Sequence, residues 1–158
     1  MSFQSLELPE YLQQAVEDLS YAEPTAIQSL AIPQIISGKD IIAEAQTGTG
    51  KTAAFGLPLM KMLNDLPPKK KKISVQALVV VPTRELAIQV ATAFKAFAKH
   101  SPKKIKMMSL IGGENVEDQM RALRMGIDAV IATPGRLLDI IKRGEIRLVE
   151  LETLVLDE

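Results

Sequence analysis

Short runs of β-branched and other apolar residues alternate with longer segments of helical periodicity along the chain. The short runs predict strands at residues 40–44, 77–81, 104–110, 127–132 and 153–156. The longer segments predict helices at 51–63, 84–99, 115–124 and 134–143, preceded by helices at 9–19 and 25–36, the second disturbed by Pro33. A helix between two strands of one sheet makes a right-handed crossover, so this order predicts an α/β fold with a parallel sheet and helices on both faces.

The composition is typical of a folded domain and excludes several classes of protein. The chain has 158 residues, 47% of them hydrophobic, which is enough for one domain with a core. Its 19 basic and 19 acidic residues cancel, so any contact with nucleic acid must be local. The lack of cysteine excludes disulfides and thiolate metal sites, and one histidine cannot form a metal cluster. No apolar run is long enough to span a membrane, and we expect a cytoplasmic protein without membrane contacts.

A run of four lysines, Lys69 to Lys72, follows two prolines and precedes the strand predicted at 77–81. The run could bind nucleic acid, but its position places it at the amino edge of the sheet. Ligands of open α/β sheets bind at the opposite edge, so we interpret the run as a solvated loop.

The segment after the first predicted strand has the composition of a phosphate-binding loop: Ala45, Gln46, Thr47, Gly48, Thr49, Gly50, Lys51 and Thr52. Glycines let backbone N–H groups turn toward an anion, and the N-terminus of the following helix adds a partial positive charge. Lys51 is expected to reach the β and γ phosphates, and the Thr52 hydroxyl to hold Mg²⁺. The strict pattern begins with glycine, where this chain has Ala45.

Two carboxylates, Asp157 and Glu158, follow the last predicted strand. Alone they would be interpreted as a solvated chain end. Together with a phosphate loop they predict that Asp157 holds Mg²⁺ and that Glu158 orients or deprotonates the attacking water.

Several short motifs occur in a fixed order: Tyr21-Ala22-Glu23-Pro24-Thr25-Ala26-Ile27-Gln28, the loop 45–52, Pro82-Thr83-Arg84-Glu85-Leu86-Ala87, Gly112-Gly113, Thr133-Pro134-Gly135-Arg136 and Leu156-Asp157-Glu158. This set resembles the first RecA-like domain of DEAD-box ATP-dependent RNA helicases, from Phe3 to the last residue. The resemblance implies a Q-motif region with the N-terminal helices at 1–38, and a RecA-like ATP-binding domain at 39–158. The sequence stops before the Ala-Asp that would complete the DEAD tetrad, which implies a truncated domain whose sheet lacks its last strand or strands.

The resemblance assigns adenine recognition to Gln28, stacking on the base to Tyr21, and an upstream aromatic position to Phe3. A carboxamide can both donate to and accept from adenine. Thr25 and Gln28 also have the spacing of a capping box, in which Gln28 would only cap the helix at 25–36. The two interpretations can coexist, because the amide has separate donor and acceptor ends.

The motifs after the strands at 77–81 and 127–132 resemble ordinary helix starts, with threonine as the cap and Pro134 at the first helical position. Each helix also carries an arginine in its first turn, Arg84 or Arg136, where the helix dipole disfavours a cation unless an anion binds. The resemblance implies binding of the backbone of single-stranded RNA or of an RNA duplex, without sequence specificity, by Pro82, Thr83, Arg84, Gly112, Gly113, Thr133, Pro134, Gly135 and Arg136.

The resemblance also implies that the intact enzyme uses ATP and Mg²⁺, hydrolyses ATP, and locally unwinds RNA duplexes or remodels RNA–protein complexes. A C-terminal RecA-like domain, absent from this sequence, would supply an arginine finger, so we expect the chain alone to bind adenine nucleotide but not to unwind RNA. Two alternatives remain: a module that binds RNA or a partner without useful nucleotide affinity, and a P-loop ATPase acting on another substrate. An incomplete sheet could also form a dimer of the fragment.

Overall fold

The structure, a computed structural model, describes residues 1–158 and contains two compact units. The first unit comprises Met1–Asp65 and Ala93–Lys104, and the second comprises Leu66–Thr92 and Ile105–Glu158. Helix α4 (Arg84–Phe97) begins in the second unit and ends in the first. None of the helices combines the length and the apolar character that crossing a membrane requires.

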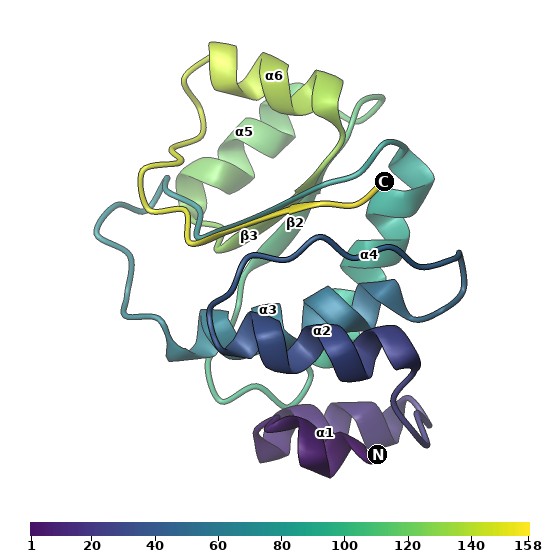
Figure 1. Ribbon diagram of the computed structural model, residues 1–158. Coiled ribbons are helices and arrows are strands. Elements are labelled where there is room, and N and C mark those ends of the chain that lie inside the picture. Colours follow the sequence, from purple (N-terminus) through teal and green to yellow (C-terminus); the bar gives the residue numbers. More distant parts are fainter. The chain divides into compact units, whose positions relative to one another are not determined.

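The first unit is helical and contains the 3-10 helix η1 (Phe3–Leu6) with helices α1 (Glu10–Asp18), α2 (Ala26–Ile36) and α3 (Lys51–Asp65) (Figure 1). Helix α2 packs against α3. Pro33 lies inside this helix, which continues to Ile36, so the proline does not end it. Proline has no N–H, so Pro33 removes one backbone donor from the helix.

The strand predicted at 40–44 does not form. This segment has no regular secondary structure, and Ile41 and Ile42 have exposed fractions of 39% and 104%. An extended segment gains backbone hydrogen bonds only when another strand lies beside it, and residues 40–44 pair with none. The composition of the segment is that of a buried strand, but the partner that such a strand needs cannot be inferred from local composition.

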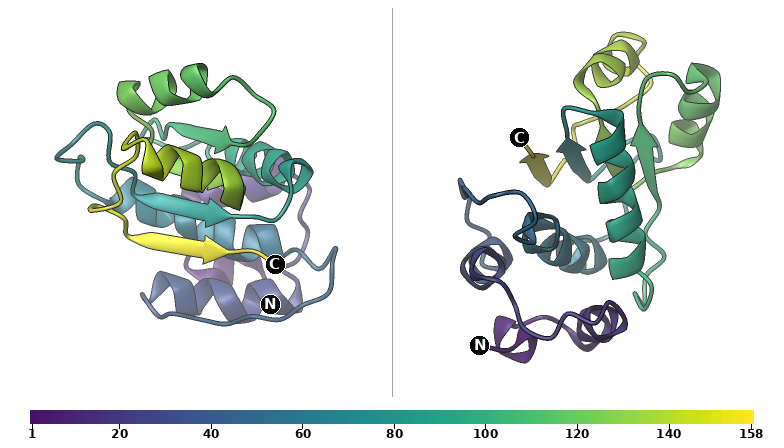
Figure 2. Two further views of the ribbon diagram at one scale, coloured as in Figure 1. Left: turned by 90° about the horizontal axis from the view of Figure 1, so that it is seen from above. Right: turned by 90° about the vertical axis from the view of Figure 1, so that its right-hand side faces the viewer.

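The second unit contains a four-stranded sheet in the order β2-β3-β1-β4, formed by β1 (Ala77–Val80), β2 (Met107–Leu110), β3 (Ala129–Ala132) and β4 (Thr153–Leu156). Figure 2 shows the yellow strand β4 beside the teal strand β1. Every pair is parallel, with Ala77 opposite Ala129 in β3 and opposite Thr153 in β4. The prediction of a parallel sheet flanked by helices is therefore confirmed. The strands at β2 and β3 are shorter than the predicted 104–110 and 127–132.

Helices α5 (Val116–Met125) and α6 (Pro134–Lys142) pack on the sheet of the second unit. Their apolar faces form one core with the strands, in which Leu78, Val130, Leu123 and Ile140 are almost completely buried. Parallel strands connected by helices bring their carboxyl ends to one edge, so the loops after β1, β2 and β3 meet there.

Strand β4 is at the edge of the sheet, so one side of its backbone lacks a neighbouring strand. Leu154 and Leu156 project from one face of it with exposed fractions of 53% and 73%. An exposed apolar edge of this kind is a ready site for pairing with another strand.

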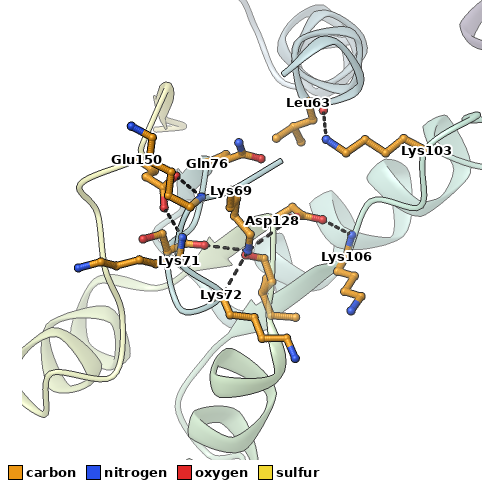
Figure 3. A network of polar contacts seen from close by, with 12 residues as sticks. Leu63, Lys69, Lys71, Lys72, Gln76, Lys103, Lys106, Asp128 and Glu150 are labelled. Carbon is orange, nitrogen blue, oxygen red and sulfur yellow. Dashed lines mark hydrogen bonds and ion pairs between the residues drawn. The ribbon is translucent and has the colours of Figure 1, made fainter. Parts of the chain in front are cut away.

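The lysine run forms a brace at the amino edge of the sheet (Figure 3). The Lys69 ammonium donates hydrogen bonds to the carbonyls of Ile127 (2.7 Å), Ser74 (2.8 Å) and Lys72 (3.2 Å), and forms an ion pair with Asp128. The side chain of Lys69 is only 11% exposed, so the interpretation of the run as a solvated loop is wrong for this residue.

The loop around Lys69 is closed by a carboxylate from the segment before β4. Glu150 accepts the backbone N–H groups of Lys70 (2.8 Å) and Lys71 (3.1 Å), and the Lys70 N–H in particular lowers the pKa of this carboxyl. The side chains of Lys70, Lys71 and Lys72 are exposed, as a solvated loop requires.

Candidate functional site

The predicted phosphate loop lies in the first unit and leads directly into α3, whose first residue is Lys51. Gly48 and Gly50 have φ values of +82° and +84°, a left-handed conformation that glycine adopts without strain. The Thr49 hydroxyl donates to the carbonyl of Gln46 at 2.6 Å and closes the turn. A glycine-containing turn at the start of a 15-residue helix has the backbone N–H groups and the dipole that bind an anion.

Gln28 joins the start of α2 to this loop. The capping box is confirmed: the Thr25 hydroxyl accepts the Gln28 N–H, and Gln28 Oε1 accepts the Thr25 N–H at 3.0 Å. At its other end, Gln28 Nε2 donates to the carbonyl of Gly50 at 3.1 Å. The side chain is 4% exposed, and each end of the amide keeps one further hydrogen-bonding position.

Phe3 and Tyr21, the two aromatic residues predicted near the nucleotide, stack on each other in the first unit. Their ring centroids are 6.4 Å apart and the rings are inclined by 27°. Phe3 is buried, whereas Tyr21 is 39% exposed. The buried ring therefore supports an accessible one, which is the arrangement that a stacking surface for a planar ligand needs.

The predicted carboxylates follow β4 in the second unit. The backbone N–H of Asp157 donates to the carbonyl of Val80 at 3.0 Å, which extends the pairing of β4 with β1 by one residue. Thr52, the other predicted ligand of Mg²⁺, belongs to the first unit with Lys51. The side chains of Thr52 and Asp157 offer the hard oxygen ligands that Mg²⁺ prefers.

The residues predicted to bind RNA come together in the second unit, at the carboxyl ends of β1, β2 and β3. They line a hollow of about 550 Å³ formed by Pro82, Thr83, Arg84, Glu85, Gly112, Gly113, Thr133, Gly135 and Arg136. This set contains every residue predicted for RNA except Pro134, and adds Glu85.

The two helix starts beside this hollow differ in their caps. The Thr83 hydroxyl accepts the Leu86 N–H at 3.2 Å, so the predicted cap of α4 is confirmed. Thr133 occupies the N-cap position of α6 and Pro134 begins the helix, as predicted, but the Thr133 hydroxyl makes no capping hydrogen bond. Pro134 has no N–H, and the next donors of α6 lack a side-chain acceptor, so they remain available to an anion.

Arg84 and Arg136 are held only by neutral acceptors, from the loop after β2 and from Gln119 of α5. Arg84 Nη1 donates to the carbonyl of Gly112 at 3.4 Å, and Arg136 Nη1 donates to the carbonyl of Glu114 at 3.2 Å and to Gln119 Oε1 at 2.6 Å. Neither forms an ion pair, in contrast to Arg121, Arg124 and Arg143 in the same unit, each of which pairs with a carboxylate. Two arginines beside the hollow therefore have no ion-pair partner within the protein.

Glu114 and Gln119, the residues that hold Arg136, were not predicted from the sequence. Gln119 is buried in α5 beside Met120, on the face that packs into the core. A polar amide at a position where helical periodicity requires an apolar residue was the available signal.

Comparisons with known proteins agree with one another. A family model described as DEAD/DEAH box helicase matches residues 25–158. The chain is 46% identical to the ATP-dependent RNA helicase DeaD of Haemophilus influenzae, over 100% of this chain and 25% of that protein. It is also 46% identical to the DEAD-box ATP-dependent RNA helicase CshA of Bacillus cereus, over 99% of this chain and 29% of that protein.

A solved structure has the same fold. The crystal structure of a DEAD box protein from the hyperthermophile Methanococcus jannaschii matches 100% of this chain and 41% of that protein, with a TM-score of 0.88 and 34% identity. The chain thus spans about a quarter of the length of the curated relatives and less than half of the solved one.

Proposed function

Because the chain belongs to the DEAD/DEAH box helicase family, we propose that it forms the first RecA-like domain of an ATP-dependent RNA helicase. It would bind ATP with Mg²⁺, mainly through residues of its first unit, and the RNA backbone through residues of its second. The names of the relatives support the reaction class. The glycine-containing loop of the first unit supports nucleotide binding, and the hollow of the second unit supports RNA binding.

ATP fits the residues of the first unit. The loop 45–52 presents glycines in left-handed conformations and a helix start, and Gln28 keeps a donor and an acceptor for adenine while it caps α2. Tyr21 would stack on the base, backed by Phe3. Lys51 would bind the terminal phosphates and Thr52 would hold Mg²⁺. Of the residues in the second unit, Asp157 would hold Mg²⁺ and Glu158 would orient the attacking water. Bound Mg²⁺ would neutralise charge on the phosphates.

The observation that carries the RNA assignment is the hollow of about 550 Å³ flanked by Arg84 and Arg136, both held by neutral acceptors. Such a site favours an anionic backbone, because phosphate oxygens supply the missing negative charge without any reading of base edges. Gly113, with φ +82°, lets a phosphate or ribose approach the loop closely.

A test of the nucleotide assignment compares thermal stabilisation by ATP, ADP and GTP with Mg²⁺. A ligand at a hundred times its Kd stabilises the folded state by about 2.7 kcal/mol, so binding gives a measurable shift in Tm. We expect a shift with ATP and ADP only, lost in Lys51→Ala and in Gln28→Glu, and kept in Lys95→Ala, which replaces an exposed lysine. Equal shifts with GTP would contradict adenine recognition by Gln28.

A test of the RNA assignment measures binding of a labelled single-stranded oligouridylate by fluorescence anisotropy. Arg136→Ala should weaken binding and reduce the salt dependence, whereas Arg121→Ala, which removes an arginine already paired with Asp118, should change little. Equal binding by the parent and Arg136→Ala would contradict the assignment.

We also propose that the rest of the intact protein supplies the second RecA-like domain, and that this chain alone does not unwind RNA. An arginine finger contributes roughly 10³ to 10⁵ in rate, so ATP hydrolysis by the chain alone should be close to background. Addition of the missing domain should restore RNA-dependent hydrolysis, and strong hydrolysis without it would contradict this proposal.

One observation favours the alternative of an RNA- or partner-binding module with weak nucleotide affinity. Residues 40–44 form no strand, so the phosphate loop lacks the rigid support that precedes such loops. The absence of any ATP-induced shift in Tm, together with normal RNA binding, would select this alternative.

The edge strand β4, with Leu154 and Leu156 exposed, supports self-association of the chain.

A further inference from the structure

Gln119 is a buried amide at the centre of a small hydrogen-bond network. It lies in α5 with an exposed fraction of 4%, on the same face as the buried Met120 and Leu123. Its Nε2 donates to the carbonyl of Ile111 at 3.0 Å and to Glu114 Oε2 at 3.2 Å, and its Oε1 accepts from Arg136 Nη1 at 2.6 Å. Both ends of the amide are therefore engaged, which fixes its orientation.

The two donor contacts of Gln119 bracket the Gly-Gly pair. Ile111 directly precedes Gly112, and Glu114 directly follows Gly113. The carbonyl of Gly112 in turn accepts from Arg84. One buried side chain thus contacts both ends of the loop that touches Arg84, and also contacts Arg136 directly.

Gln119 is a neutral acceptor for Arg136, where a carboxylate would form an ion pair with it. A guanidinium that contacts a carboxylate is largely neutralised, as for Arg121, Arg124 and Arg143. Both acceptors of Arg136 are neutral, one an amide oxygen and the other a backbone carbonyl. They orient the guanidinium without forming an ion pair with it, so an external anion can still pair with Arg136.

We infer that Gln119 is a positioning residue for RNA: it fixes Arg136 and the loop 111–114 without forming an ion pair with Arg136, so that a backbone phosphate can pair with the guanidinium. This inference rests on the proposed function of the hollow. It adds that a neutral amide is required at position 119, where a carboxylate of the same shape would compete with RNA for Arg136.

The test uses Gln119→Glu and Gln119→Met in the anisotropy assay, at several KCl concentrations. Glutamate loses the donor contacts to Ile111 and Glu114, as methionine does, but keeps an acceptor for Arg136 and adds the competing charge. The affinity for oligouridylate should therefore fall at least about tenfold, with a salt slope smaller by about 0.7. Methionine has a similar length and removes the hydrogen bonds but leaves Arg136 charged, so the affinity should fall about threefold to tenfold with an unchanged slope.

Gln89→Glu is the matched control, because it adds the same charge at an exposed glutamine of α4. If Gln119 acted in folding alone, Gln119→Glu and Gln119→Met would both have a lower Tm, and the salt dependence of RNA binding would have the same slope in the two. Three results would overturn the inference. The first is that Gln119→Glu has the same affinity for oligouridylate and the same salt slope as Gln89→Glu. The second is that Gln119→Glu and Gln119→Met reduce the salt slope equally, and the third is that Gln119→Met binds with the affinity of the parent. If Gln119→Glu does not fold, the result with Gln119→Met decides.

Failure of this inference differs from failure of the proposed function. If Arg136→Ala weakens RNA binding while both Gln119 variants bind like the parent, only the inference is wrong. If Arg136→Ala itself binds RNA like the parent, the hollow is not the RNA site and the proposed function fails with it.

Discussion

Gly112 and Gly113 are adjacent in the loop after β2 but differ in what a larger side chain would meet. A Cβ on Gly113 would lie 2.4 Å from Arg84 Nη1, and its φ of +82° is strained for any other residue. A Cβ on Gly112 would meet nothing within 4 Å, and its backbone is not left-handed. The pair therefore offers a substitution and its control one residue apart.

We expect Gly113→Ala to weaken binding of oligouridylate, because the new methyl group displaces the Arg84 guanidinium. Left-handed alanine costs about 1–2 kcal/mol, so the unfolding free energy should also fall by about that amount. Gly112→Ala should change both quantities little. Anisotropy and urea denaturation of the two variants check this, and equal RNA binding by both would show that Arg84 is not needed in its observed position.

Tyr11 shows the cost of a polar atom without a partner. Its hydroxyl is buried in the first unit and makes no hydrogen bond, and burial, followed by the charge of Asp65, raises the pKa of Tyr11 to about 12. The folded state therefore holds the phenolic proton more tightly than the unfolded state, whose pKa is about 10. The stability associated with the neutral phenol is complete below pH 10 and declines as pH rises toward 12.

Tyr11→Phe tests this dependence. At pH 7 the variant should be no less stable than the parent, because phenylalanine fills the site without a buried hydroxyl. Between pH 10 and pH 12 the Tm of the parent should fall relative to that of the variant. Parallel Tm curves across this range would contradict the raised pKa of Tyr11.

At the scale of elements, the brace at Lys69 joins the segment before β1 to the start of β3. Lys69→Met removes three hydrogen bonds from a charged donor and leaves the carbonyls of Ser74 and Ile127 without it. We expect the unfolding free energy to fall by about 1–3 kcal/mol, measured by urea denaturation. Lys71→Met, at an exposed side chain, should stay within about 0.5 kcal/mol of the parent, and an equal loss in both variants would contradict the brace.

The elements that the sequence predicted well are those whose signals are local. Helix starts such as Thr25 and Thr83 are encoded within four residues, and the parallel order follows from the alternation of helices and strands. The strand at 40–44 was wrong because pairing depends on a partner distant in the chain. Gln119 was missed because its role depends on Arg136 and Ile111, which only the folded second unit brings beside it.

At the scale of the whole molecule, the exposed edge at β4 predicts association of the chain with itself. Size-exclusion chromatography with light scattering should show a mass that rises with concentration. Leu154→Lys should suppress the rise, because a charge on an edge strand opposes pairing. Leu138→Lys, at a similarly exposed leucine of α6, is the control, and a constant monomer mass for the parent would contradict the prediction.

The position of β1 inside the sheet also has a consequence for how the chain is made. Ala77 pairs with Ala129 and with Thr153, so the ribosome releases β1 long before either of its neighbours. At about 5–20 residues per second, the apolar strand waits several seconds for β3 and longer for β4. During that interval it is available to chaperones and to other nascent chains, so the speed of translation over residues 81–156 should influence how much of the protein reaches its native fold.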